Sequence, residues 1–413
     1  MQLLSIALIV NPLAGIGGPA GLAGSDGAAT QAEAIARGAQ PLAGERAARF
    51  LRQLRRLRPD FELSVAAAGE MGAAVARREG IEPATVVGAL RAAGSSAAAE
   101  GEGSGQDGPG DLLGRTTAAD TAAAARAMLA ADPRPDVIVF AGGDGTARDV
   151  HDAVGQAIPV LGVPAGVKMQ SAVFARSPEA AAALLAGWNA EAGATAPREV
   201  ADIDEEARRR GRVVSQIWGE LRVPSGAEHL QGGKVGQTQA ARGSLPGLAA
   251  GLAERLDPAK AWLMGPGGTI RGVAEELGLP ASLLGVDLHL PRAGANGAGT
   301  NGAGARDSHL DLSAADIERL LSESGAQPQV VVSPVGGQGF LLGRGNQQIG
   351  AAVLRRLEPD DLLIVAAPAK LGELGGGPLY ADLPEGAPAE RLLGPRRVIT
   401  GRRDTAMIRL LAA

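Results

Sequence analysis

The first 165 residues alternate short apolar, β-rich runs with helical runs, and this alternation constrains the fold more than any other feature. Strands that are joined through helices lie parallel in one sheet, because a parallel pair needs a long crossover connection. We therefore predict an α/β fold whose N-terminal domain is built on a parallel sheet. The predicted strands are 4–11, 61–68, 136–141 and 158–163. The predicted helices are 43–58, 120–131 with Thr117 or Asp120 as N-cap, and one that begins just after Thr146.

The second half of the chain is richer in short extended runs, which predicts a β-rich second domain. Extended runs are expected at 211–223, 260–264, 283–290, 329–335, 362–367 and 396–400, with helices at Leu245–Leu256 and Ser313–Ser322. We place the first domain at 1–170 and the β-rich second domain at 171–413, and we expect the last strand or helix to return to the N-terminal domain. Segments 92–111 and 292–307 are mostly glycine, alanine and polar residues, so we expect flexible loops there.

Composition excludes several classes of function. A net charge of −5 opposes the sequence-independent attraction that nucleic acids and anionic membranes require, so neither is an expected partner. The chain has no cysteine and four scattered histidines, so any metal must use oxygen ligands or arrive with a substrate. Mg²⁺ carried by a nucleotide fits, and we single out no metal-ligating residue of the chain. The apolar run 3–10 lacks a basic leader and is too short to span a bilayer, which favours a cytoplasmic protein.

The sharpest motif is the strand 136–141 that runs directly into Gly142-Gly143-Asp144-Gly145-Thr146. We expect its three glycines to supply positive φ angles and a close backbone approach, and the following helix start to offer N–H groups to a phosphate. Asp144 can accept a hydrogen bond from a sugar hydroxyl and take its proton during attack on phosphorus. The alternative is an ordinary Gly-Asp-Gly turn, but a bare turn does not require the flanking Gly142 and Thr146.

Other strand ends carry similar turns. Gly166 and Lys168 follow the strand 158–163, and Lys168 either reaches a phosphate or is a solvated surface lysine. Asn11 opens a third turn after the first strand. Because the carboxyl ends of neighbouring parallel strands line one crevice, these turns could face a common ligand. Later glycine-rich turns add the nucleotide-binding candidates Gly267, Gly268, Thr269, Gly337 and Asn346.

These motifs resemble those of the ATP-NAD kinase family, in particular its acetoin-catabolism X-type branch. The most specific matches are the blocks 140–149 and 162–169, and the segments 336–340 and 343–348 resemble that branch. The resemblance implies a Rossmann-like domain followed by a β-rich domain, a fold shared with diacylglycerol kinases. It also implies ATP or polyphosphate as donor, NAD as acceptor and a homo-oligomer.

Carried onto this sequence, the resemblance assigns activation of the NAD 2′-hydroxyl to Asp144. It assigns phosphate binding to Gly142, Gly143, Gly145 and Thr146. The Asn-Glu pair and the Thr-Pro-Thr-Gly-Ser-Thr-like stretch of well-studied NAD kinases are absent in that form. Asn346 is the candidate substitute for the pair, and 265–269 for the stretch.

Two alternatives to an NAD kinase follow from the same residues. One is a non-catalytic NAD-binding sensor linked to acetoin-type catabolism. The other is a lipid or small-molecule kinase of the same superfamily, although no basic amphipathic helix is visible in the sequence.

Overall fold

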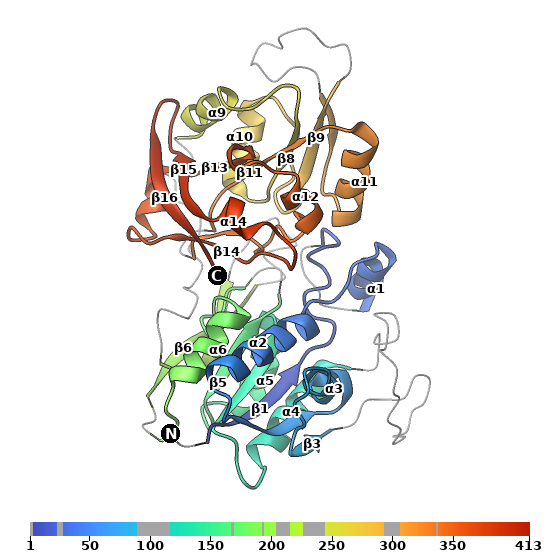
Figure 1. The fold of residues 1–413 in the computed structure, drawn as a ribbon, viewed down its shortest axis with the longest axis vertical. Helices are drawn as coiled ribbons and strands as arrows, with labels where there is room; N and C mark the ends of the chain where they lie inside the picture. The colour runs from blue at the N-terminus through green and yellow to red at the C-terminus, as the bar shows by residue number, and fades with distance from the viewer. Residues whose placement is uncertain are drawn as a thin grey trace. The chain divides into compact units, whose positions relative to one another are not determined.

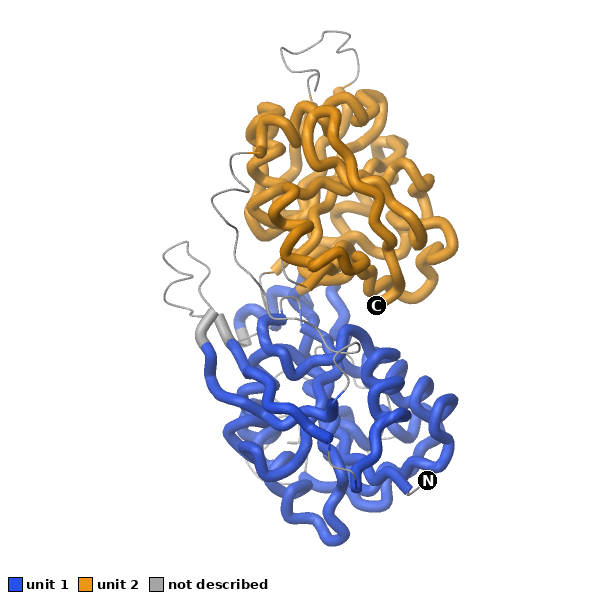
Figure 2. The backbone as a smooth tube through the Cα atoms, turned by 90° about the vertical axis from the view of Figure 1, so that its left-hand side faces the viewer, with its two compact units in different colours: residues 1–17, 24–233 blue, residues 18–23, 234–413 orange. Residues whose placement is uncertain are grey.

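The computed structural model describes residues 3–22, 28–88, 116–166, 169–191, 194–203, 215–225, 244–292, 306–335 and 338–413. The chain divides into two compact units (Figure 2). Unit 1 comprises residues 1–17 and 24–233, and unit 2 comprises residues 18–23 and 234–413. The predicted boundary after residue 170 therefore lies inside unit 1.

Unit 1 is built on a parallel sheet of five strands in the order β3-β2-β1-β4-β5. Figure 1 labels β1, β3 and β5 of this sheet. This arrangement confirms the predicted N-terminal parallel sheet. The chain first builds outward from β1 through β2 to β3, and then crosses back to place β4 on the other side of β1. The strand order thus reverses between β1 and β4. The strands are β1 Ser5–Val10, β2 Glu62–Ala67, β3 Thr85–Val87, β4 Val137–Gly142 and β5 Val160–Pro164.

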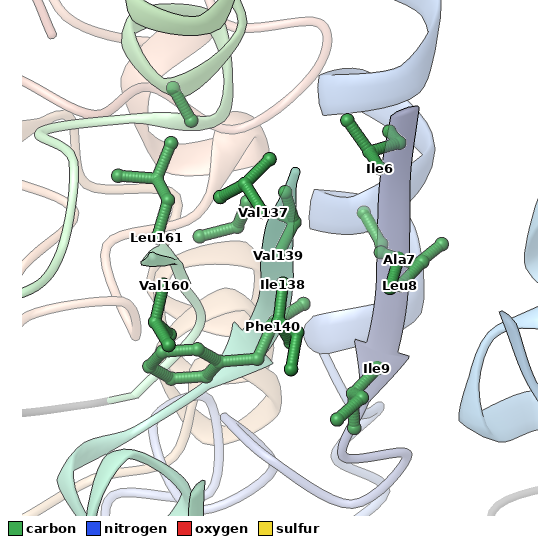
Figure 3. Close-up of a cluster of buried hydrophobic side chains, with 14 of the residues drawn as sticks. Ile6, Ala7, Leu8, Ile9, Val137, Ile138, Val139, Phe140, Val160 and Leu161 are labelled. Atoms are coloured by element: carbon green, nitrogen blue, oxygen red, sulfur yellow. The ribbon is translucent and has the colours of Figure 1, made fainter. Parts of the chain in front are cut away.

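The central strands are apolar along their whole length because both faces of the sheet are covered. Every residue of β4 is buried, and so are the residues of β1 from Ile6 to Val10. Figure 3 shows aliphatic side chains of β1 and β4 in the unit 1 core, with the ring of Phe140 at one end. That ring meets Phe174 edge to face at 5.2 Å between centroids.

Helices cover the two faces of this sheet in separate groups. α2 packs with α3 and α6, whereas α4 packs with α5. Right-handed crossovers explain the separation, because reversing the direction of strand addition moves the connecting helix to the other face. Thr117 is the N-cap of α4 and forms a capping box with Asp120. The helices are α1 Ala28–Ala36, α2 Ala43–Leu57, α3 Ala73–Arg78, α4 Ala118–Leu129, α5 Asp144–Val154 and α6 Pro178–Gly187, with a 3₁₀ turn η1 at Gly69–Met71.

An antiparallel ribbon completes the described part of unit 1. It consists of β6 Thr195–Ile203 and β7 Ser215–Pro224. The pairing register shifts between Val200 and Ala201. A β-bulge of this kind turns backbone groups away from the ladder and makes them available to other partners.

Unit 2 contains a nine-stranded mixed sheet in the order β10-β9-β8-β11-β13-β15-β16-β14-β12, which confirms the predicted β-rich second domain. Its strands are β8 Ala261–Met264, β9 Asp287–Pro291, β10 Arg306–His309, β11 Pro328–Val332, β12 Phe340–Leu342, β13 Leu362–Val365, β14 Leu379–Ala381, β15 Gly394–Ile399 and β16 Thr405–Ala412. Its helices are α9 Leu245–Ala253, α10 Gly268–Glu276, α11 Ala314–Ser324, α12 Ala351–Arg355, α13 Pro368–Gly372 and α14 Ala389–Leu392, with a 3₁₀ turn η4 at Pro359–Asp361.

Alternate residues of the central unit 2 strands enter two separate apolar cores. Trp262 and Met264 pack with residues of α9 and α10, whereas Ala261 and Leu263 pack with residues of α11 and α12. Because successive side chains of a strand point to opposite faces, helices cover both faces of this part of the sheet. The centre of unit 2 is therefore a three-layer α/β structure within a β-rich unit.

Two expected loops and the last strand differ from expectation or lie outside the described residues. The expected loop 292–307 ends earlier, because Arg306 and Asp307 already belong to β10, which pairs with β9. Residues 293–305 lie outside the described part of the chain, as does the whole expected loop 92–111. The last strand, β16, pairs with β15 and β14 in unit 2 rather than returning to the N-terminal sheet.

Candidate active site

The turns that follow β1, β4 and β5 meet at the carboxyl ends of these neighbouring strands. The backbone N–H of Asn11 donates to the Ala141 carbonyl at 2.9 Å, and the Ala165 N–H donates to the Gly142 carbonyl at 2.9 Å. Gly15, with φ +82°, lies so close to Ala165 that a Cβ on it would come within 2.2 Å of the Ala165 carbonyl oxygen. Strand order reverses here, and ligands of open α/β sheets bind at such points.

The Gly142–Thr146 turn brings the sheet into α5 with almost no intervening loop. Gly143 is the N-cap in extended backbone, with φ −115° and ψ −168°, and Asp144 is the first helical residue. None of Gly142, Gly143 and Gly145 has a positive φ, so that expectation is wrong. Gly142 is needed for a different reason, because a Cβ there would lie 2.4 Å from the Thr146 hydroxyl oxygen.

Asn11 and Thr146, two predicted site residues, are in direct contact. The Asn11 Nδ2 donates to the Thr146 Oγ1 at 3.0 Å, and the Asn11 Oδ1 accepts from the Leu13 N–H at 3.3 Å. Thr146 is only 3% exposed. The turn after β1 is thereby fixed to the first turn of α5.

The Asp144 carboxylate accepts hydrogen bonds from residues of its own unit that follow β5. Its Oδ2 accepts from the Gln170 N–H at 2.7 Å. Its Oδ1 accepts from the Ser171 N–H at 3.0 Å and from the Ser171 Oγ at 2.7 Å. Asp144 is 7% exposed. The side chain is therefore a buried acceptor whose orientation is fixed by the segment that follows β5.

The sequence reasoning missed Gln170 and Ser171 as site residues. Ser171 Oγ lies 2.9 Å from the Ala201 carbonyl oxygen and accepts from the Ala201 N–H at 3.0 Å. The bulge in β6 occurs at Ala201, which explains why these backbone groups face Ser171. A serine hydroxyl has a single proton, so it donates either to Asp144 or to Ala201 at any one time. Only the position of Gln170-Ser171 just after Lys168 could have indicated their role.

Gly166 and Lys168 are the remaining predicted site residues of unit 1. Gly166 is half-buried, and its Cα would be 3.5 Å from a Cβ added to Gly143. It therefore belongs to the same group of turns as Asp144. Lys168 lies outside the described residues.

In unit 2, Gly267 and Gly268 open α10, with Gly267 at φ +116°. Thr269 is 5% exposed, and its Oγ1 lies 3.4 Å from the Nζ of Lys370. Gly337 lies outside the described residues.

Asn346 is a structural residue of its own loop. Its Nδ2 donates to the Leu341 carbonyl at 2.9 Å, and its Oδ1 accepts from the Gly343 N–H at 2.8 Å. The residue is 5% exposed. Its amide closes the turn after β12, so a ligand would have to displace these bonds to use it.

Comparison with known families gives two matches. The ATP-NAD kinase N-terminal domain matches residues 6–192, and the ATP-NAD kinase C-terminal domain matches residues 293–378. No curated protein and no solved structure matches the chain. In the part of the chain that the structure describes, no helix combines the length and apolar character needed to cross a membrane.

Proposed function

The chain belongs to the ATP-NAD kinase family, and from this premise we propose that it transfers the γ-phosphoryl group of ATP to the adenosine-ribose 2′-hydroxyl of NAD. The hydroxyl oxygen forms a bond to the γ-phosphorus while the bond from that phosphorus to the β-bridging oxygen breaks. ADP leaves and the Asp144 carboxylate takes the hydroxyl proton, which gives NADP. Magnesium enters with ATP as part of the substrate.

The fixed carboxylate of Asp144 is the observation that carries this proposal. In phosphoryl transfer the protein contributes mainly by positioning and by electrostatic stabilisation. An acceptor held by the Gln170 and Ser171 N–H groups can orient an incoming hydroxyl at little entropic cost. Asp144 also lies at the point where the strand order reverses, beside Thr146 and Asn11.

Ser171 can release the Asp144 Oδ1 for a hydrogen bond from the 2′-hydroxyl of the substrate. Rotation of the Ser171 hydroxyl proton from Asp144 Oδ1 to the Ala201 carbonyl, 2.9 Å from Oγ, releases one donor from the carboxylate. The 2′-hydroxyl then takes its place on Oδ1. In this scheme Ser171 is a positioning residue and Asp144 is the catalytic residue.

The proposal is tested by assaying NADP formation with the purified full-length chain. NAD is supplied with Mg-ATP in one arm and with Mg-polyphosphate in a second, and 2′-deoxy-NAD replaces NAD in a control arm. We expect NADP from NAD and no phosphorylated product from the deoxy analogue. Absence of NADP with both donors would refute the proposed activity.

One observation favours a second function, that of an NAD-binding sensor without turnover. Asp144 is 93% buried and its carboxylate already has donors within unit 1, so it could serve the fold alone. Calorimetry distinguishes the two functions. A sensor binds NAD but forms no NADP with either donor. The kinase binds NAD and also forms NADP.

A further inference from the structure

A short stretch near the N-terminus belongs to unit 2, although the chain before it and the chain after it belong to unit 1. The chain leaves unit 1 at Gly17, and the next residue, Gly18, is already part of unit 2. We call residues 18–22 the strap. It directly follows the turn after β1, which carries Asn11.

The strap is docked on the segment that leads into α11. The carbonyl of Pro19 accepts a hydrogen bond from the N–H of Ala314, the first residue of that helix, at 2.9 Å. Gly21 lies so close to the same segment that a Cβ on it would come within 3.0 Å of the Leu312 carbonyl oxygen. Backbone groups of both partners thus meet at two positions.

A further contact joins the strap to the glycine-rich loop after β12. A Cβ on Gly18 would lie 3.2 Å from the Cδ of Gln347. Gln347 belongs to the segment 343–348, which the sequence marks out but the proposed reaction does not use. The close approach gives this segment a part in holding the strap.

The segment under the strap is itself fixed. The Leu312 N–H donates to the Val286 carbonyl at 3.0 Å, and the Asp311 N–H donates to the Oδ1 of Asp287 at 2.8 Å. Asp287 is the first residue of β9 and is 1% exposed. The strap therefore rests on a segment that is tied to the sheet of unit 2.

The turn before the strap is packed just as closely within unit 1. Gly15 leaves no room for a Cβ beside the Ala165 carbonyl, and Asn11 is bonded to the first turn of α5. Between Gly15 and the strap lie Ile16 and Gly17, so the chain has little length in which to absorb a shift of the strap. The link between the two anchored stretches is the covalent chain itself.

We propose that the strap is a positioning element for the candidate active site. Its docking on unit 2 fixes the turn after β1, and the bond from Asn11 to Thr146 passes this restraint to the helix start that carries Asp144. Unit 2 thereby helps to position Asp144. The effect on turnover rests on the proposed function, whereas the restraint on the turn does not and is tested without substrate.

The decisive variant is Ala314→Pro. Proline is well accepted at the first position of a helix, where the N–H has no intrahelical acceptor. Ser313 before it has φ −75° and ψ 164°, the extended conformation that a residue preceding proline prefers. The change therefore preserves α11 but removes the donor to Pro19 and places a ring carbon against that carbonyl.

Two variants serve as controls for this change. Ala314→Ser keeps the backbone N–H and should behave as wild type. Ala118→Pro makes the same substitution at the first position of α4, after Thr117 in extended backbone, and is remote in sequence from the strap and its partners.

The measurement is hydrogen exchange of the full-length chain, which reports local opening. We expect Ala314→Pro to raise the exchange rates of the strap and of residues 13–16 by about 3- to 10-fold, as for loss of one hydrogen bond of ordinary strength. Both controls should keep wild-type rates. Faster exchange of the strap alone would overturn the proposal, and so would unchanged exchange of the strap.

A second pair of variants tests the docking without a change to α11. Gly21 and Gly38 both have φ +75°, so an alanine strains the backbone equally at the two positions. A Cβ on Gly38 would meet nothing within 4 Å, whereas a Cβ on Gly21 would press on the Leu312 carbonyl. Gly21→Ala should raise exchange at 13–16 and Gly38→Ala should not. Equal rates in the two variants would contradict the proposal.

NADP formation by the same proteins tests the link to Asp144. In Ala314→Pro we expect kcat per folded molecule to fall about 3- to 10-fold, with Ala118→Pro at the wild-type value. A wild-type kcat despite faster exchange at 13–16 would refute this link. If the wild-type chain forms no NADP, the proposed function fails, and hydrogen exchange alone decides whether the strap positions the turn.

Discussion

The side-chain amide of Asn11 donates a hydrogen bond to the hydroxyl of Thr146, 135 residues away in the sequence, at 3.0 Å. This bond joins the turn after the first strand to the helix start that carries Asp144. Neighbouring parallel strands bring the two segments together, but the side-chain contact fixes their relative position. We regard it as the brace of the candidate site.

The brace should be measurable as a coupling energy. Thr146→Val keeps the branched shape beside Gly142 but removes the acceptor, and Asn11→Ala removes the donor. Each single change should lower the free energy of unfolding, and the double-mutant cycle should give a coupling of about 1 kcal/mol. Additive effects in chemical denaturation would show that the contact contributes nothing to stability.

Gly142 should not tolerate even a methyl group. A Cβ there would approach the Thr146 Oγ1 to 2.4 Å, so Gly142→Ala should lower the free energy of unfolding by about 1–3 kcal/mol through overpacking. Gly187→Ala is the matched control, because a Cβ at Gly187 would meet nothing within 4 Å.

Adding Thr146→Ala to Gly142→Ala should recover part of the lost stability, because it removes two of the three clashing atoms, the Thr146 Oγ1 and Cγ2, and leaves the Cβ at 2.5 Å. Denaturation of the four chains, wild type, two single variants and the double variant, measures this rescue. If Gly142→Ala unfolds at the same denaturant concentration as Gly187→Ala, the close approach does not explain the glycine.

Periodicity and strand–helix alternation were enough to predict the core of unit 1. The runs 4–11, 136–141 and 158–163 are continuous apolar segments, and they form β1, β4 and β5 because both faces of these strands are buried. β3 was not predicted, since Thr85–Val87 is a three-residue edge strand with exposed positions and no periodic signal.

The candidate site was predicted only in part. Asn11, Gly142 and Thr146 follow strands, and chain order alone indicates that strand ends converge. The hydrogen bonds from Gln170 and Ser171 to Asp144 could not be predicted from the sequence. They depend on how the chain folds back after β5 toward the bulge in β6. The loop hydrogen bonds of Asn346, to the Leu341 carbonyl and from the Gly343 N–H, could not be foreseen either, and its role in nucleotide binding stays a prediction.

Ser171 should contribute more to stability than an ordinary buried serine. Ser171→Ala removes a donor to Asp144 and leaves the Ala201 N–H without its present acceptor, so we expect a loss of about 1–3 kcal/mol. Ser64→Ala is the control, because the Ser64 Oγ makes one backbone hydrogen bond, to the Ile6 carbonyl at 3.2 Å. Equal losses in chemical denaturation would contradict a bridging role for Ser171.

His289 should make the stability of unit 2 depend on pH. Burial lowers its pKa from 6.5 to about 4, against the attraction of Asp287 and assisted by Arg306 and His309. The unfolded chain therefore takes up a proton at a higher pH than the folded chain. The free energy of unfolding is therefore highest above pH 6.5. It falls as the pH drops from 6.5 toward 4, by about 3 kcal/mol in total.

The measurement is the free energy of unfolding at several pH values for wild type and His289→Gln. The variant should lose the part of the pH dependence between 6.5 and 4 that corresponds to one proton. His151→Gln, which replaces a histidine of unit 1, serves as control and should keep it. An unchanged slope in His289→Gln would rule out the buried histidine as the cause.

The most direct test of the account is the turnover of NADP formation in Asp144→Asn compared with Asp152→Asn, an exposed carboxylate two turns along the same helix. Denaturation first establishes that both variants are folded. If Asp144 orients and activates the 2′-hydroxyl, its replacement should lower kcat by at least about 100-fold, while Asp152→Asn stays near wild type. Wild-type turnover in a folded Asp144→Asn chain would contradict the account.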